Sequence, residues 1–187
     1  MSKLTIDGID VVGKRVLVRV DFNVPLDADG GVLDDRRIRM AIPTLRSVLD
    51  RGGSLVLMSH LGRPAGTGFE PAYSLKPVAD RLAELLPGVP VTLASEDCIG
   101  PNADRAVGGL EPGGIVLLEN LRFHAAEKKN DPEFAAKLAA HGDVYVNDAF
   151  GTAHRAHASM VGVPEAMQDR HRVAGRLLEA ELAFLAE

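Results

Sequence analysis

The segment 147–159 (NDAFGTAHRAHAS) carries two histidines, an arginine and two hydroxyl residues, but few large apolar side chains. It follows the short apolar run Val144-Tyr145-Val146, which predicts a buried strand. Because the segment has little apolar volume, it can contribute little to a core. A loop of cationic and hydrogen-bonding groups at the end of a strand is suited to receiving an anion.

Other segments also place polar or charged residues directly after an apolar run. With the segment above they form four groups: Asp21 and Asn23; His60 and Arg63; Arg122; and His154, Arg155 and His157. Arg37, near the start of the first predicted helix, can reach the same place. The planar guanidinium of arginine binds phosphate and carboxylate in a bidentate manner, so several arginines would hold a small, multiply charged acid. We expect Asp21 to orient an arginine or to accept a hydrogen bond from a substrate hydroxyl.

These groups meet only if the apolar runs are parallel strands of one sheet, because ligands bind beyond the carboxyl ends of such strands. The sequence favours this arrangement, since apolar runs alternate with segments of helical periodicity. Strands are predicted at 15–20, 54–59, 89–93, 115–118 and 143–146. Helices are predicted from 34 or 35, at 75–86, 101–107, 132–140 and 175–187, with a kink or a late start at Pro43. The predicted fold is a three-layer α/β/α Rossmann-like domain with a mainly parallel sheet of about six strands, plus a C-terminal helix.

The amino-acid composition favours a globular domain and disfavours several classes of function. A chain of 187 residues, 46% hydrophobic, suits one α/β domain with its own core. The net charge of -5 and the small aromatic content disfavour a nucleic-acid or membrane-surface binder. The single cysteine, Cys98, indicates a reducing compartment and has no basic neighbour to activate it. No apolar run approaches the ~20 residues that span a bilayer, so we expect a soluble, cytoplasmic protein.

Taken one at a time, the candidate residues have ordinary structural explanations. Asp21 and Asn23 are common turn formers, and His60 could be a hydrogen-bonded structural histidine. Arg63 and Arg122 could be solvated or paired at the surface. The case for a site rests on all of them following strands.

Other chemistries have less support. His154-x-x-His157 together with His60 offers three imidazole ligands, but no cysteine or carboxylate pair adjoins them, so no metal site is predicted. Neither a Gly-x-Ser-x-Gly nucleophile motif nor a phosphate-binding Walker loop occurs. Two acidic residues are interpreted as salt-bridge or surface residues rather than catalytic acids: Glu119 and Glu127.

Four long segments, in this order, resemble the signature segments of phosphoglycerate kinases: 19–25 (RVDFNVP), 59–64 (SHLGRP), 118–123 (LENLRF) and 147–159. The resemblance covers nearly all of the chain and corresponds to the N-terminal half of that family. It implies a domain that binds 3-phosphoglycerate or 1,3-bisphosphoglycerate in a basic patch. By motif position, the implied substrate-binding residues are Asp21, Asn23, Arg37, His60, Arg63, Arg122 and Arg155. Among them, Arg37 matches the catalytic arginine thought to stabilise the phosphoryl group in transit.

The resemblance also implies a second domain that carries Mg-ATP or Mg-ADP, a monomeric glycolytic enzyme, and a helix that joins the two domains. We therefore expect a substrate-binding domain at 1–170 and the start of the interdomain helix at 171–187. The nucleotide-binding domain is expected to be absent, so the fragment would bind substrate without turnover. Arg176 and Ala180 depart from the family pattern, which usually has phenylalanine and lysine there. The alternative is a non-catalytic anion-binding or regulatory module that has kept the basic patch.

Overall fold

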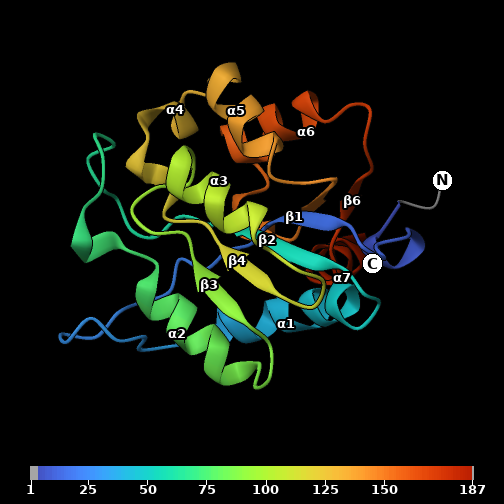
Figure 1. The fold of residues 1–187 in the computed structure, drawn as a ribbon, viewed down its shortest axis with the longest axis horizontal. Helices are drawn as coiled ribbons and strands as arrows, with labels where there is room; N and C mark the ends of the chain where they lie inside the picture. The colour runs from blue at the N-terminus through green and yellow to red at the C-terminus, as the bar shows by residue number, and fades with distance from the viewer. Residues whose placement is uncertain (1–3, 187) are drawn as a thin grey trace.

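The computed structural model describes residues 4–186, whose centre is a single six-stranded parallel sheet (Figure 1). Its strand order is β3-β4-β2-β1-β5-β6. The strands are β1 Arg15–Arg19, β2 Ser54–Met58, β3 Val91–Leu93, β4 Ile115–Leu117, β5 Val144–Asn147 and β6 Arg172–Ala174. The predicted α/β fold and sheet size are confirmed.

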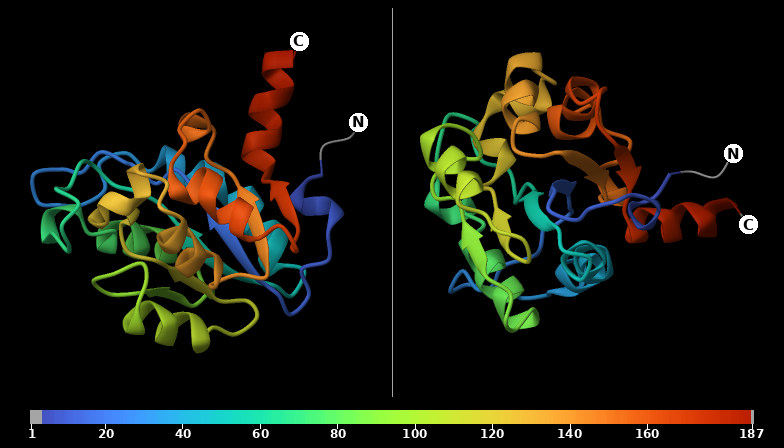
Figure 2. Two further views of the ribbon diagram at one scale, coloured as in Figure 1. Left: turned by 90° about the horizontal axis from the view of Figure 1, so that it is seen from above. Right: turned by 45° about the vertical axis from the view of Figure 1, so that its right-hand side comes forward.

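Helices cover both faces of this sheet, which gives the predicted three layers (Figures 1 and 2). One hydrophobic cluster joins the sheet to α1 and α2, and the other joins it to α3, α5 and α6. The helices are α1 Arg36–Leu49, α2 Lys76–Leu85, α3 Pro101–Gly108, α4 Ala125–Lys128, α5 Pro132–Ala139, α6 Val163–Ala166 and α7 Arg176–Ala186.

Successive side chains of a strand point to opposite faces of the sheet, and both faces are buried here. The central strands are therefore nearly continuous apolar runs. In β1, Val16 and Val18 belong to the cluster beneath α1 and α2, whereas Leu17 belongs to the opposite cluster. Leu17 is paired in register with Tyr145 of β5, which faces the same way. A strand that is buried on both faces needs apolar residues at successive positions, as is usual in parallel sheets.

Helix signals in the sequence were correct for α5 and for the start of α1, but one of the two alternatives for Pro43 was wrong. Asp131 caps α5, because its Oδ1 accepts a hydrogen bond from the Phe134 amide at 2.9 Å. Helix α1 begins at Arg36 and continues through Pro43, so the alternative of a late start is wrong. Proline removes only one backbone donor, and Leu45 continues the buried face of the helix beyond it.

The segment after α6 was only partly predicted. Strand β6 was not located from the sequence, because it has three residues and begins with the exposed Arg172. It pairs with β5 through Val146 and Val173. Helix α7 follows and projects from the body of the domain (Figure 2). Within residues 4–186, no helix has the length and apolar character needed to cross a membrane.

Candidate anion-binding site

A cavity of about 250 Å³, here called the strand-end cavity, lies beyond the carboxyl ends of β1, β2 and β5. Gly62, Gly151 and Thr152 form part of its wall. All seven residues predicted from the sequence complete that wall: Asp21, Asn23, Arg37, His60, Arg63, Arg122 and Arg155. The segments that follow the strands therefore meet at one edge of the sheet, and four arginines surround one small cavity.

Asp21 and Asn23 organise one side of the strand-end cavity. The Arg37 guanidinium donates from Nη1 to Asp21 Oδ1 at 3.1 Å and to the Asn23 carbonyl at 2.9 Å. The Gly62 amide donates to Asn23 Oδ1 at 2.9 Å, which joins the segments after β1 and β2. Asp21 thus orients an arginine, which is one of the two roles expected for it from the sequence. The Arg37 side chain lines the cavity and is 52% exposed, so it also remains open to solvent.

Arg122 lies deeper and is only 6% exposed. Its Nη1 donates to the Gly62 carbonyl at 3.1 Å, whereas Nε and Nη2 are buried and have no partner among the described residues. Burial lowers the pKa of Arg122, and the neighbouring Arg155 and Arg19 lower it further. Buried donors are normally satisfied, and leaving a charged one unpaired is costly. An anion in the strand-end cavity would relieve that cost.

The position of Arg122 depends on Asn120, which links two site segments. Asn120 Oδ1 accepts from the Arg122 amide at 3.0 Å, and its Nδ2 donates to the Leu61 carbonyl at 2.7 Å. Asn120 is fully buried. Its side chain therefore holds the segments after β2 and β4 together, which keeps Arg122 beside Gly62.

His60 is the other buried member of the wall, with 4% of its surface exposed. Its Nδ1 lies 3.0 Å from Nη2 of Arg19. Burial lowers the pKa of His60 to about 2, and the charges of Arg19, Arg122 and Arg155 act in the same direction. The imidazole is therefore neutral at physiological pH, whereas Arg63 and Arg155 are exposed and charged.

Arg19 was not selected from the sequence, because it directly follows the apolar run Val16-Leu17-Val18 at the end of β1 and was counted as part of the strand. It is nevertheless fully buried, in direct contact with a wall residue of the cavity. Glu127, interpreted as a salt-bridge or surface residue, is also buried, and its Oε1 accepts from Ser159 Oγ at 2.6 Å. The signal that could have found Arg19 is a full charge at a position where a central strand must be buried.

The two histidines of the 147–159 segment do not line the strand-end cavity. His154 is exposed and outside the wall. His157 is partly buried, and burial together with Arg122 and Arg155 lowers its pKa to about 4. Within residues 4–186, the imidazoles of His60, His154 and His157 do not form a group that could share a metal ion.

The described residues that do place three donor atoms within 4.8 Å of one another are Asp97, Cys98 and His124. His124 Nε2 already contacts Asp97 Oδ1 at 2.5 Å. Burial raises the pKa of the Cys98 thiol well above its ordinary value, so the thiol stays protonated at physiological pH. A protonated, fully buried thiol is a poor nucleophile.

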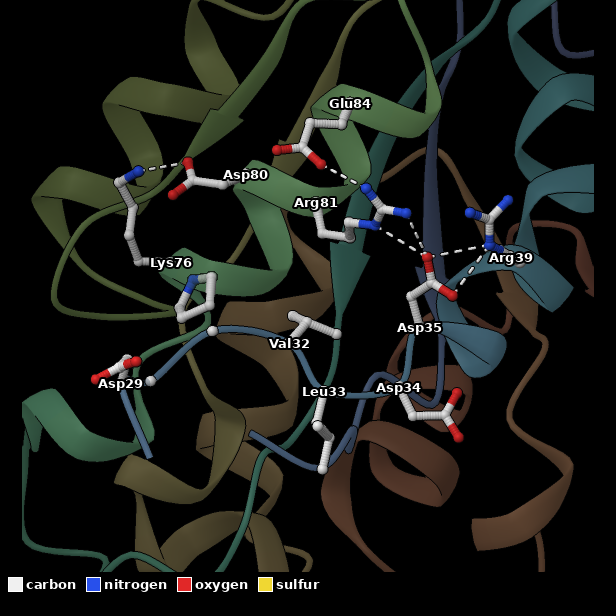
Figure 3. Close-up of a pocket in the computed structure, with 13 residues that line it drawn as sticks. Asp29, Val32, Leu33, Asp34, Asp35, Arg39, Lys76, Asp80, Arg81 and Glu84 are labelled. Carbon is white, nitrogen blue, oxygen red and sulfur yellow. Dashed lines mark hydrogen bonds and ion pairs between the residues drawn. The ribbon is translucent and has the colours of Figure 1, made fainter. Parts of the chain in front are cut away.

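A larger cleft of about 890 Å³ lies elsewhere, between α2 and the segment before α1 (Figure 3). Its cations are paired within the cleft. Arg39 and Arg81 both contact Asp35, at 3.0 and 2.8 Å, and Lys76 contacts Asp80. Because these charges are already compensated, the smaller strand-end cavity is the better candidate for an anion site.

Comparison with known proteins decides the family. The family model for phosphoglycerate kinase matches residues 6–187. The chain belongs to the phosphoglycerate kinase family. Two curated phosphoglycerate kinases, from Rhodopirellula baltica and Chlorobaculum tepidum, are each 56% identical, over 187 and 185 residues. Those matches cover 100% and 99% of this chain but 47% and 45% of the relatives, so the chain spans about half their length.

Solved phosphoglycerate kinase structures have the same fold. The Coxiella burnetii structure superposes with a TM-score of 0.85 at 35% identity, over 99% of this chain and 44% of that one. The Pyrococcus horikoshii structure gives a TM-score of 0.82 at 32% identity, over 98% and 45% of the two chains. The resemblance of the four sequence segments to phosphoglycerate kinases is thereby confirmed.

Proposed function

We propose that the strand-end cavity binds 3-phosphoglycerate or 1,3-bisphosphoglycerate and that this chain is the acid-substrate half of a phosphoglycerate kinase. The observation that carries the proposal is Arg122, a buried guanidinium whose Nε and Nη2 have no partner among residues 4–186. A phosphate or carboxylate oxygen offers the acceptors that these donors need. Membership of the family and the other arginines of the wall support the same ligand.

The longer protein would transfer a phosphoryl group reversibly between 1,3-bisphosphoglycerate and ADP, giving 3-phosphoglycerate and ATP. Such transfer depends on positioning and on neutralising charge that spreads over the phosphoryl oxygens. The buried residues Arg122 and His60 would hold the acid substrate. Arg37, tied to Asp21 yet open to the cavity mouth, would be the catalytic residue that meets the transferring group.

Mg-ATP or Mg-ADP would be presented by a domain of the longer protein outside this chain, with α7 as the connection. Closure of the two domains would bring the nucleotide to the mouth of the strand-end cavity and exclude water. The 187-residue chain would accordingly bind the acid substrate without turnover. A generic anion-binding module is the competing function, and it would bind phosphate as tightly as 3-phosphoglycerate.

Calorimetric titration with 3-phosphoglycerate tests the proposal. We expect Arg122→Met to weaken binding by about 10- to 100-fold, because a hydrogen bond to a charged group contributes ~1.5–3 kcal/mol. Arg39→Met is the matched control: it removes the same charge from the separate cleft of Figure 3 and should bind as the parent chain does. Equal weakening in both variants, or equal affinity of the parent chain for phosphate, would contradict the proposed substrate.

A further inference from the structure

We propose that Arg19 is a positioning residue that holds His60 in the neutral tautomer with its proton on Nε2, so that the imidazole donates a hydrogen bond to the anion in the strand-end cavity. This inference rests on the proposed function, since it concerns how the same cavity holds its ligand. It adds a residue outside the wall and assigns His60 a defined chemical state.

The tautomer follows from the contact between the two side chains. Arg19 Nη2 lies 3.0 Å from His60 Nδ1, and a guanidinium can only donate. His60 Nδ1 must therefore be the acceptor, without a proton of its own. In a neutral imidazole the single proton is then on Nε2.

Arg19 is held in place by a chain of buried hydrogen bonds. Its Nε donates to Ser159 Oγ at 2.9 Å, and its Nη1 donates to the Val20 carbonyl. Ser159 Oγ in turn donates to Glu127 Oε1 at 2.6 Å, and the Ser159 carbonyl accepts from the Tyr145 hydroxyl at 2.8 Å. A buried cation needs a nearby anion, and Glu127 supplies it across Ser159. The guanidinium therefore cannot rotate away from His60 without breaking this network.

The other ring nitrogen is available to a ligand. His60 lines the strand-end cavity, and within residues 4–186 its Nε2 has no hydrogen-bond partner. The charged and titratable groups that act on the ring are Arg19, Arg122, Arg155 and His157, and all of them disfavour its protonation. A neutral N–H thus provides a directional donor to the anion without adding another buried positive charge beside Arg122.

Nitrogen-15 NMR of the histidine rings in the intact, ligand-free chain tests the tautomer, with His60→Gln used to assign the signals. Protonated and unprotonated ring nitrogens give well-separated signals. We expect His60 to show a protonated Nε2 and an unprotonated Nδ1 throughout pH 8 to 5. A proton on Nδ1, or titration of His60 near pH 6.5, would overturn the proposal without any need for a variant.

Arg19→Met tests the cause. We expect both tautomers of His60 to appear, its titration to move toward pH 6.5, and 3-phosphoglycerate to bind at least about tenfold more weakly. Arg170→Met is the matched control, because Arg170 also donates to buried carbonyls, those of Ala139 and Gly142, but is remote from His60. An unchanged tautomer in Arg19→Met would contradict the role of Arg19. If the parent chain does not bind 3-phosphoglycerate, the proposed function fails while the ring signals still decide this inference.

Discussion

At the scale of single residues, the arginines of the strand-end cavity have different tasks because they differ in burial. Arg122 is buried and has two donors without a partner among residues 4–186, whereas Arg37 is bonded to Asp21, and Arg63 and Arg155 are exposed. Exposed cations are screened by water and salt, whereas a buried guanidinium acts in a medium of lower dielectric constant. Affinity for the acid substrate should therefore depend more on Arg122 than on Arg63.

The lowered pKa of His60 predicts a loss of stability in mild acid. As the pH falls below the ordinary value of 6.5, the unfolded chain takes up a proton at His60 while the folded chain, with a pKa of about 2, does not. Stability that is present above pH 6.5 is therefore lost below it, by up to about 2 kcal/mol between pH 7 and 5. Urea unfolding of the parent chain and of His60→Gln should show a smaller pH-dependent loss in the variant. Identical losses would contradict the assignment.

At the scale of elements, α7 is attached to the domain mainly at its first turn. Asp148 Oδ1 accepts from the amides of Leu177 and Leu178 at 3.0 and 3.2 Å. Burial raises the pKa of Asp148 to about 6, so the carboxylate is largely ionised at neutral pH and is a strong acceptor. Gly175 is required beside it, because a Cβ there would lie 2.2 Å from Asp148 Oδ1. Arg176 contacts Asp7 at 2.8 Å.

We predict that Asp148→Ala loosens α7, with ~1 kcal/mol lost from its N-terminal cap. Hydrogen exchange should become faster at the Leu177 and Leu178 amides, whereas Asp148→Asn, which keeps an acceptor, should exchange nearly as the parent chain does. Asp131→Ala removes the corresponding cap of α5 and serves as the control, with faster exchange at Phe134 instead. Unchanged exchange at Leu177 in Asp148→Ala would show that the carboxylate does not hold the helix.

Sequence patterns predicted the elements that contain a clear apolar run. They did not predict the features that depend on contacts with distant parts of the chain. The apolar runs of β1, β2, β4 and β5 predicted both the sheet and the edge at which the wall residues meet, because parallel topology decides which strand ends are neighbours. Strand β6 is too short to show a period, and its pairing depends on β5. The buried hydrogen-bond network of Arg19 joins residues 140 positions apart, and no local pattern encodes such a contact.

At the scale of the whole molecule, a chain with a net charge of -5 nevertheless places four arginines around one cavity at the edge of the sheet. The cations that line the larger cleft are instead paired with carboxylates of the same cleft, so the two cavities differ in charge balance. The domain also has hydrophobic clusters on both faces of its sheet. We therefore expect the 187-residue chain to fold and to present a preformed anion site.

Mapping of backbone amide signals during a titration with 3-phosphoglycerate tests this account most directly. We predict that the signals of Gly62, Gly151 and Thr152, which line the strand-end cavity, shift in a saturable manner. Signals of Gly30 and Val32, which line the larger cleft, should stay unchanged. Shifts confined to the larger cleft, or no shift anywhere at millimolar ligand, would contradict the claim that the strand-end cavity is the site of the acid substrate.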